Sequence, residues 1–226
     1  MQCQTVKKPS NTNWLKNATV VQDREEVLQE YVKEGSLLDC GVVDSWKSVQ
    51  ATEERLQGFA TSLHEHLRQM NPDVLGVDID AEGIELLRKR GYNVRCENVE
   101  NMQLDEQFDT IVAGELIEHL PNPGLMLQNL REHLKPGGNL ILSTCNPFYV
   151  KHHWNIWRRG DIRVHDEHTA WFEPHTISRL LHMSGFEVKR LAWIRKRSML
   201  GMVKLWPAML RHYFLPNFLV VASPTE

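Results

Sequence analysis

The sequence lacks several features that mark common classes of protein. Its four cysteines, Cys3, Cys40, Cys96 and Cys145, form no C-x-x-C pair, which argues against a structural zinc site and for a reduced, cytoplasmic chain. It has no apolar run long enough to span a bilayer and no recognisable signal peptide. The formal charge of −3 supplies no general attraction for nucleic acid, so we expect no nucleic-acid partner.

Apolar runs alternate with helical periodicities along the 226 residues, the pattern of an α/β domain with a parallel sheet. The expected strands are residues 36–43, 74–79, 92–96, 108–113, 140–144, 188–194 and 218–222, and the expected helices are 23–33, 62–70, 81–90, 124–134 and 173–184. We therefore predict a single domain over residues 1–226.

Four stretches do not fit this alternation. They are a polar N-terminal segment (1–22), an insertion after the first strand (44–60), a Trp-, His- and Arg-rich segment without period (148–172), and an insert between the last two strands (195–216). The second is too long for an ordinary turn, so we interpret it as a lid or an extra helix.

The second expected strand ends in acid, in the run LGVDID at residues 75–80, and a helical pattern follows at once. Open α/β folds bind nucleotides at the carboxyl edge of the sheet, where an acid can accept hydrogen bonds from a ribose diol. We take Asp78 as that acid and expect Asp80 to cap the next helix. The alternative is that both carboxylates only cap the helix.

Two later motifs carry a family resemblance. Residues 108–123 read FDTIVAGELIEHLPNP and residues 134–144 read LKPGGNLILST. With the acid-ended second strand, they resemble the class I S-adenosylmethionine-dependent methyltransferases over roughly residues 36–148. Residues 168–181 (HTAWFEPHTISRLL) look like the subset that contains small-molecule, sugar and lipid methyltransferases.

The resemblance implies a Rossmann-like, doubly wound sheet of seven strands in the order 3-2-1-4-5-7-6, with the last strand antiparallel and helices on both faces. It implies a cytoplasmic transferase that uses S-adenosyl-L-methionine to methylate an O or N atom of a small-molecule, sugar or lipid-linked acceptor. The sequence does not name that atom or the oligomeric state.

The first turn departs from the family pattern. The family shows an acid followed by Gly-x-Gly, whereas residues 38–44 read LDCGVVD, so Asp39 and Gly41 match and the later glycines do not. Glycine allows positive φ and close backbone approach, so this change bears on cofactor affinity. The alternative function is therefore a non-catalytic methyltransferase-like module with lost or weakened cofactor binding. A nicotinamide dehydrogenase is disfavoured because it also needs the glycine-rich turn.

The resemblance also implies which residues contact the cofactor. Asp39 would lie under the methionine amino group, Asp78 would bind the ribose, and Ile79 would pack on the adenine. Asn98, whose side-chain carbonyl can accept from the adenine amine, lies in a loop that would meet the adenine edge. The full cofactor-binding set is Asp39, Gly41, Asp78, Ile79, Asn98, Val99, Ala113, Gly114 and Glu115.

Methyl transfer from a sulfonium needs an in-line nucleophile, and a hydroxyl acceptor also benefits from a base. His119 is our candidate base because imidazole titrates near neutrality, and the adjacent Glu118 is expected to orient it. The alternative is that both residues are ordinary polar contacts that hold the loop.

Five histidines, at positions 152, 153, 165, 168 and 175, invite comparison with a metal site. None of them has H-E-x-x-H-like spacing, so we assign no metal. We interpret residues 148–172 as an acceptor-side lid, with core packing as the alternative for Trp171 and Phe172. The substrate-binding candidates are His152, His153, Trp154, His168 and Trp171.

The insert at residues 195–216 is basic and apolar and contains Trp206, which is typical of an interfacial element. One hypothesis is peripheral contact with an anionic membrane or a lipid-linked acceptor. The alternative is packing on the domain's own core or in a dimer.

Overall fold

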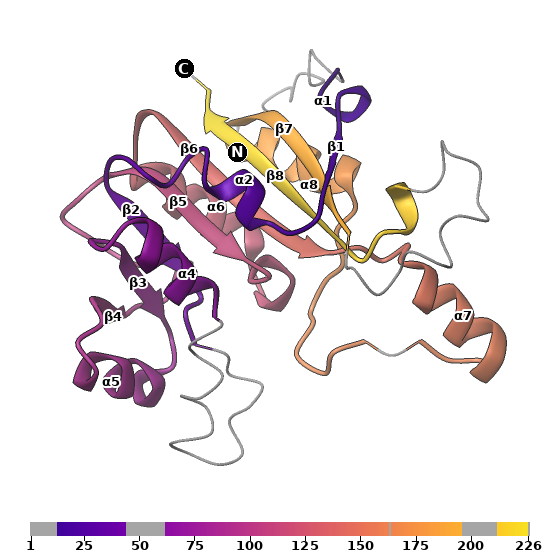
Figure 1. Ribbon diagram of the computed structural model, residues 1–226, viewed down its shortest axis with the longest axis horizontal. Helices are drawn as coiled ribbons and strands as arrows, with labels where there is room; N and C mark the ends of the chain where they lie inside the picture. The colour runs from indigo at the N-terminus through magenta and orange to yellow at the C-terminus, as the bar shows by residue number, and fades with distance from the viewer. Residues whose placement is uncertain (1–12, 44–61, 163, 196–211, 226) are drawn as a thin grey trace, which may run out of the picture.

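The computed structural model describes residues 13–43, 62–162, 164–195 and 212–225, and these form one mixed eight-stranded sheet with helices on both faces (Figure 1). The strands are β1 (Thr19–Val21), β2 (Leu37–Cys40), β3 (Leu75–Asp78), β4 (Val94–Cys96), β5 (Phe108–Gly114), β6 (Leu134–Cys145), β7 (Phe186–Ile194) and β8 (Asn217–Pro224). The α-helices are α1 (Asn13–Lys16), α2 (Glu25–Leu28), α4 (Leu63–Met70), α5 (Ala81–Lys89), α6 (Pro123–Glu132), α7 (Val150–Arg159) and α8 (Pro174–Met183).

The sheet order is β1-β7-β8-β6-β5-β2-β3-β4. Without β1, this is the predicted order of seven strands, and β8 is antiparallel to both β6 and β7 as predicted. The eighth strand was not predicted: β1 pairs in parallel with β7, with Thr19 opposite Ala192. No element was assigned to the polar N-terminal segment, and the structure places α1 and β1 there; the edge strand is short and two of its three residues are exposed.

Both faces of the sheet are buried, which explains the nearly continuous apolar strands. On one face α6 and α8 pack through Met126, Leu130, Ile177 and Leu181. On the other face α2 and α4 contribute a smaller core that includes Val27 and Leu67. A third cluster seats α5 against β4.

Helix starts follow the expected capping residues. Ser62 Oγ accepts a hydrogen bond from the Glu65 amide at 3.2 Å, and Asp80 Oδ1 accepts one from the Gly83 amide at 3.0 Å. Glu173 forms a capping box with Thr176 at the start of α8. Such caps satisfy amides that have no partner inside the helix.

Three elements differ from expectation. The helix expected at 23–33 is reduced to α2, four residues long. The strand expected at 140–144 starts earlier, since β6 also includes the KPGG sequence at 135–138. Its register with β5 is irregular there: Leu134 pairs with Phe108 and Asn139 pairs with Thr110. The aperiodic segment contains α7, a helix with no buried residue that extends away from the sheet (Figure 1).

Two predictions lie outside the described residues, namely the lid at 44–60 and most of the insert at 195–216. Among the helices that are described, none is both long enough and apolar enough to cross a bilayer.

Candidate active site

A cleft of about 620 Å³ lies at the carboxyl ends of the central strands. Nine predicted site residues line it: Gly41, Asp78, Ile79, Asn98, Gly114, Glu115, Glu118, His119 and His168. The sequence did not indicate several other lining residues, namely Arg24, Ser62, Leu120, Pro121, Cys145 and Glu167. One end is built around Asp78 and the other around His119, and we call these the Asp78 end and the His119 end.

Asp78 ends β3 and is only 6% exposed. Its Oδ2 accepts a hydrogen bond from the Val43 amide at 2.8 Å, and its Oδ1 accepts one from the Asp80 amide at 2.9 Å. Burial raises the pKa of Asp78, and these two amide bonds oppose that rise. A carboxylate has about four lone-pair sites, so two acceptor positions remain for a ligand.

The rim of the Asp78 end combines an apolar and a polar side chain. Ile79 is 71% exposed, which is unusual for isoleucine and leaves a flat apolar surface over the cleft. Asn98 Oδ1 accepts a bond from the Glu100 amide at 2.9 Å. Its predicted neighbour Val99 is buried in the core and supports this loop from below.

The first turn keeps one required glycine. Gly41 has φ +82°, and a Cβ there would lie 3.1 Å from Leu116 Cδ1, so the turn favours glycine. Val42 and Val43 occupy the positions of the missing glycines and line the cleft. The amide of Val43 is the one that holds Asp78.

Asp39 lies behind the cleft wall, 1% exposed, with its Oδ2 3.0 Å from His64 Nδ1. His64 lines the cleft and packs over β3, where a Cβ on Gly76 would come within 2.8 Å of its ring. The His64 ring therefore lies between Asp39 and the cleft. Ala113, also predicted to line the site, is fully buried in β5 beneath it.

The middle of the cleft contains one positively charged side chain. The Arg24 guanidinium lies close to Gly114, because a Cβ on that glycine would be 3.3 Å from Arg24 Nη1. Arg24 is the only arginine or lysine among the residues that line this cleft in the described part of the chain. Five acidic residues share the lining with it: Asp78, Glu100, Glu115, Glu118 and Glu167.

Glu115 marks a strained point between the two ends. Its backbone has φ 52°, a conformation that costs a non-glycine residue about 1–3 kcal/mol. Asn217 Nδ2 donates to its Oε1 at 2.6 Å, and the Glu115 amide donates to the Ser143 carbonyl at 2.8 Å. These bonds fix the Glu115 carboxylate at the cleft surface.

Glu118 is 1% exposed at the His119 end. Its Oε1 accepts a long bond of 3.3 Å from the Cys145 amide, while Oε2 finds no partner among the described residues. Burial raises its pKa to about 7, and nearby Glu115 adds to the rise. The expected orientation of His119 by Glu118 is not what the structure has, because the carboxylate near His119 Nδ1 is Glu167, at 4.0 Å.

His119, His165 and His168 come together at this end. The Thr169 amide donates to the Glu118 carbonyl at 2.8 Å, and the His168 amide donates to the His165 carbonyl at 3.0 Å. These backbone bonds bring two histidines from the segment after α7 to the loop after β5. Burial and then His165 lower the pKa of His119, and burial and then His119 lower that of His168 to about 4.

The other predicted acceptor-side residues lie outside the cleft lining. The His152 ring packs 5.5 Å from that of Trp171, and the His153 ring 5.7 Å from that of Phe214. Trp154 packs 5.0 Å from Trp157 on the exposed face of α7. Of the five substrate-binding candidates, the structure brings only His168 to the cleft.

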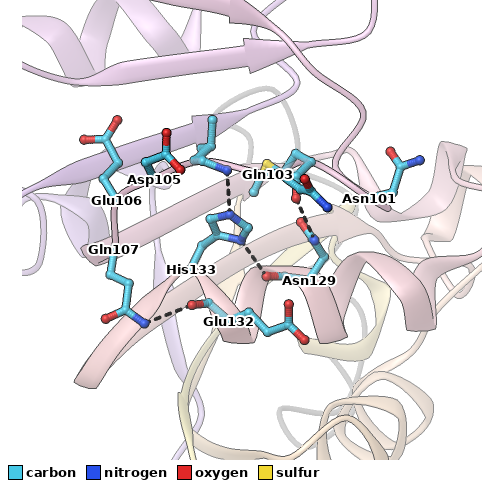
Figure 2. A pocket seen from close by; sticks show the side chains of 10 residues that line it. Asn101, Gln103, Asp105, Glu106, Gln107, Asn129, Glu132 and His133 are labelled. Carbon is cyan, nitrogen blue, oxygen red and sulfur yellow. Dashed lines mark hydrogen bonds between the residues drawn. The ribbon is translucent and has the colours of Figure 1, made fainter.

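A second hollow of about 540 Å³ lies beside α6 (Figure 2). His133 braces it: the Leu104 amide donates to Nε2 at 3.0 Å, and Nδ1 lies 2.9 Å from the Asn129 carbonyl. Both ring nitrogens are thus used in holding the loop to the helix. None of the predicted site residues lines this hollow.

Comparison with known proteins gives a consistent family. A family model described as "Methyltransferase domain" matches residues 58–191, more than half of the chain. The ubiquinone biosynthesis O-methyltransferase of Coxiella burnetii is 35% identical over 147 residues, 54% of this chain and 61% of that protein. The enzyme of the same name from Nitrobacter winogradskyi is 36% identical over 90 residues, 37% of this chain and 34% of that protein. The matches thus span between one third and three fifths of these relatives.

Solved structures support the fold alone. A SAM-dependent methyltransferase from Archaeoglobus fulgidus superposes with a TM-score of 0.61 at 17% identity, covering 88% of this chain and 90% of that one. The CcbJ methyltransferase from Streptomyces caelestis gives 0.61 at 13% identity, covering 92% and 91%.

Proposed function

Because the chain belongs to the class I S-adenosylmethionine-dependent methyltransferases, we propose that it transfers the methyl group of S-adenosylmethionine to a hydroxyl oxygen of a small-molecule acceptor. The observation that carries the proposal is the cleft itself, with a ribose-type carboxylate at one end and histidines at the other. The relatives' name, O-methyltransferase, favours oxygen over nitrogen as the accepting atom.

In this proposal the nucleoside binds at the Asp78 end. Asp78 accepts hydrogen bonds from the ribose hydroxyls through its two remaining lone-pair positions. The exposed Ile79 packs on the adenine, and Asn98 lies at the adenine edge. Gly41 allows the ligand to approach the first turn closely.

The methionine part of the cofactor then lies in the middle of the cleft. Its carboxylate is placed beside Arg24, since a guanidinium matches carboxylate geometry and the surrounding wall is acidic. Its amino group is placed beside Glu115. Asp39 acts indirectly, by fixing the His64 ring that lines this part of the cleft.

The methyl group points to the His119 end, where the acceptor binds. A neutral imidazole is needed to accept the hydroxyl proton, and the lowered pKa of His119 keeps it neutral at pH 7. The proton passes to His119 as the new O–C bond forms and the C–S bond breaks, leaving S-adenosylhomocysteine. Glu167, 4.0 Å away, stabilises the resulting imidazolium.

Calorimetry with S-adenosylmethionine and S-adenosylhomocysteine tests the cofactor site, and transfer of a labelled methyl group to simple phenols and catechols tests the reaction. We expect saturable binding of both nucleosides and label in a methyl ether. Binding without transfer to any hydroxyl would favour the non-catalytic module, and no binding at all would overturn the proposal.

A further inference from the structure

The three histidines at the His119 end form a compact cluster. One ring nitrogen of each can be chosen so that all three lie within 4.8 Å of one another. The ring centroids of His119 and His168 are 4.7 Å apart and nearly perpendicular, so the rings do not stack face to face. His165 is 5.7 Å from His119 and 5.4 Å from His168.

A second set of metal-binding atoms shares a member with this cluster. Glu118, Cys145 and His168 also place one ligand atom each within 4.8 Å of the others. Glu118 is almost fully buried, and its Oε2 has no hydrogen-bond partner within the described structure. A buried carboxylate oxygen without a partner is costly unless something binds it, which is an independent sign of a ligand at this place.

We infer that His119, His165 and His168 bind a divalent cation of the Zn²⁺, Co²⁺ or Ni²⁺ class at the acceptor end of the cleft. Imidazole nitrogen is the ligand these ions share, whereas Mg²⁺ and Ca²⁺ prefer sites built from oxygen. Three histidines with a fourth position open to a cleft is also the arrangement of catalytic rather than structural zinc sites.

The geometry needs only a small adjustment. Two nitrogens bound to one tetrahedral ion at about 2.0–2.1 Å lie roughly 3.4 Å apart, so nitrogens that now lie within 4.8 Å of one another must approach by up to about 1.4 Å. His165 is exposed, so there is space for its side chain to rotate toward the other two histidines. The 3.4 Å contact from the Glu167 amide to His165 Nδ1 is long for a hydrogen bond and is easily exchanged. The fourth position would face the cleft, with Glu118 beside it.

This inference concerns the same site, and the role of the ion rests on the proposed function, of which it revises one step, the fate of the hydroxyl proton. A bound divalent ion lowers the pKa of a coordinated hydroxyl by several units. The acceptor O–H bond would then break as the oxygen coordinates the ion, and its proton would pass to water. His119 would hold the ion in this case, and would no longer take the proton.

Titration of the whole chain with Co²⁺, followed by visible absorption, tests the site without any assay of activity. We expect saturable absorption bands at one ion per chain. His165→Gln and His168→Gln should each weaken Co²⁺ binding by roughly tenfold or more. His182→Gln, on α8 and outside the cluster, is the matched control and should bind as the unaltered chain does.

The inference is overturned if the unaltered chain gives no saturable bands, or if His182→Gln weakens binding as much as His168→Gln. Thermal unfolding by circular dichroism checks that the variants are folded, and the exposed His165 position guards against loss of fold. Calorimetry with S-adenosylhomocysteine on the same samples separates the two ideas. Nucleoside binding without Co²⁺ binding overturns only the metal site, and the reverse result overturns only the proposed function.

Discussion

The two ends of the cleft hold buried carboxylates in different ways. At the Asp78 end, both oxygens of Asp78 accept short bonds from backbone amides, and these bonds oppose the effect of burial on its pKa. At the His119 end, Glu118 has one long bond, an oxygen without a partner in the described residues, and a pKa near 7. The Asp78 carboxylate is therefore held by the protein's own backbone, whereas the Glu118 carboxylate is held by a single long bond.

The junction between the two ends is strained in a way that fits this difference. Glu115 is the only non-glycine residue with positive φ in the described part of the chain. Strain of this kind persists where surrounding contacts determine the backbone, and it often occurs at functional sites. Here the hydrogen bond from Asn217 fixes the Glu115 side chain between the Asp78 end and the His119 end of the cleft.

The largest effect that would sharpen this comparison is the loss of His119. His119→Ala should lower turnover by roughly 10²–10⁴-fold, since a positioned acid–base group typically contributes that much. Its affinity for S-adenosylhomocysteine should stay close to that of the unaltered chain, because we propose that the nucleoside binds at the Asp78 end. Turnover assays with labelled S-adenosylmethionine measure the first quantity, and calorimetry measures the second. Near-normal turnover would return His119 to a structural role.

The next effect concerns the pH dependence of stability caused by Glu118. Its folded pKa of about 7 lies above its ordinary value of 4.5, so the native state binds more protons than the unfolded state between these values. The contribution of Glu118 to stability is fully present below about pH 4.5 and is lost as pH rises through 7. Between about pH 5 and about pH 8, ionisation of Glu118 should lower the free energy of unfolding by roughly 2–3 kcal/mol.

Glu118→Gln is the matched variant, because the amide is neutral at every pH. Urea unfolding at about pH 5 and about pH 8 should show the unaltered chain losing stability relative to the variant as pH rises. The comparison of the two chains is needed because His119 and His168, whose pKa values are lowered, change stability in the opposite direction near pH 4–6.5. A constant difference between the two chains would contradict the raised pKa.

A smaller effect is expected at the Asp78 end. Asp78→Ala should weaken S-adenosylmethionine binding by about 1–3 kcal/mol, the cost of leaving buried hydroxyls without their charged acceptor. Asp80→Ala is the control, because it removes the cap of α5 and should lower stability by about 1 kcal/mol without changing affinity. Equal affinities for the two variants would mean that Asp78 does not bind the ribose.

The Asp78 end could be predicted because its signals are local. Asp78 ends an apolar strand, and Asp80 and Ser62 each stand directly before a helical pattern, so a few residues of sequence predict the strand end and the two helix caps. The strand order could be predicted because the motifs of β5 and β6 resemble a known family. Among the strands that the structure describes, only β1 was missed, since three residues with one buried side chain give no hydrophobic period.

The His119 end could not be predicted in the same way. His119 lies far along the chain from His165 and His168, and tertiary hydrogen bonds from Thr169 and Ala170 to the Glu118 carbonyl bring the two segments together. No spacing rule for metal ligands or catalytic pairs covers such an arrangement. The aromatic residues of α7 misled the prediction. Trp154 was assigned to the cleft because it lies close to the cleft histidines in the sequence, but it lies on an exposed surface.

The smallest expected effect tests whether the middle of the cleft belongs to the Asp78 end. Arg24 is partly exposed, and its guanidinium lies close to Gly114. If it binds the methionine carboxylate, Arg24→Gln should weaken S-adenosylhomocysteine binding by about 1 kcal/mol, less than a buried pair because solvent screens the charge. Calorimetry should show that the variant and the unaltered chain bind adenosine, which has no carboxylate, with the same affinity. A loss for adenosine as large as that for S-adenosylhomocysteine would mean that Arg24 shapes the cleft rather than binding the carboxylate.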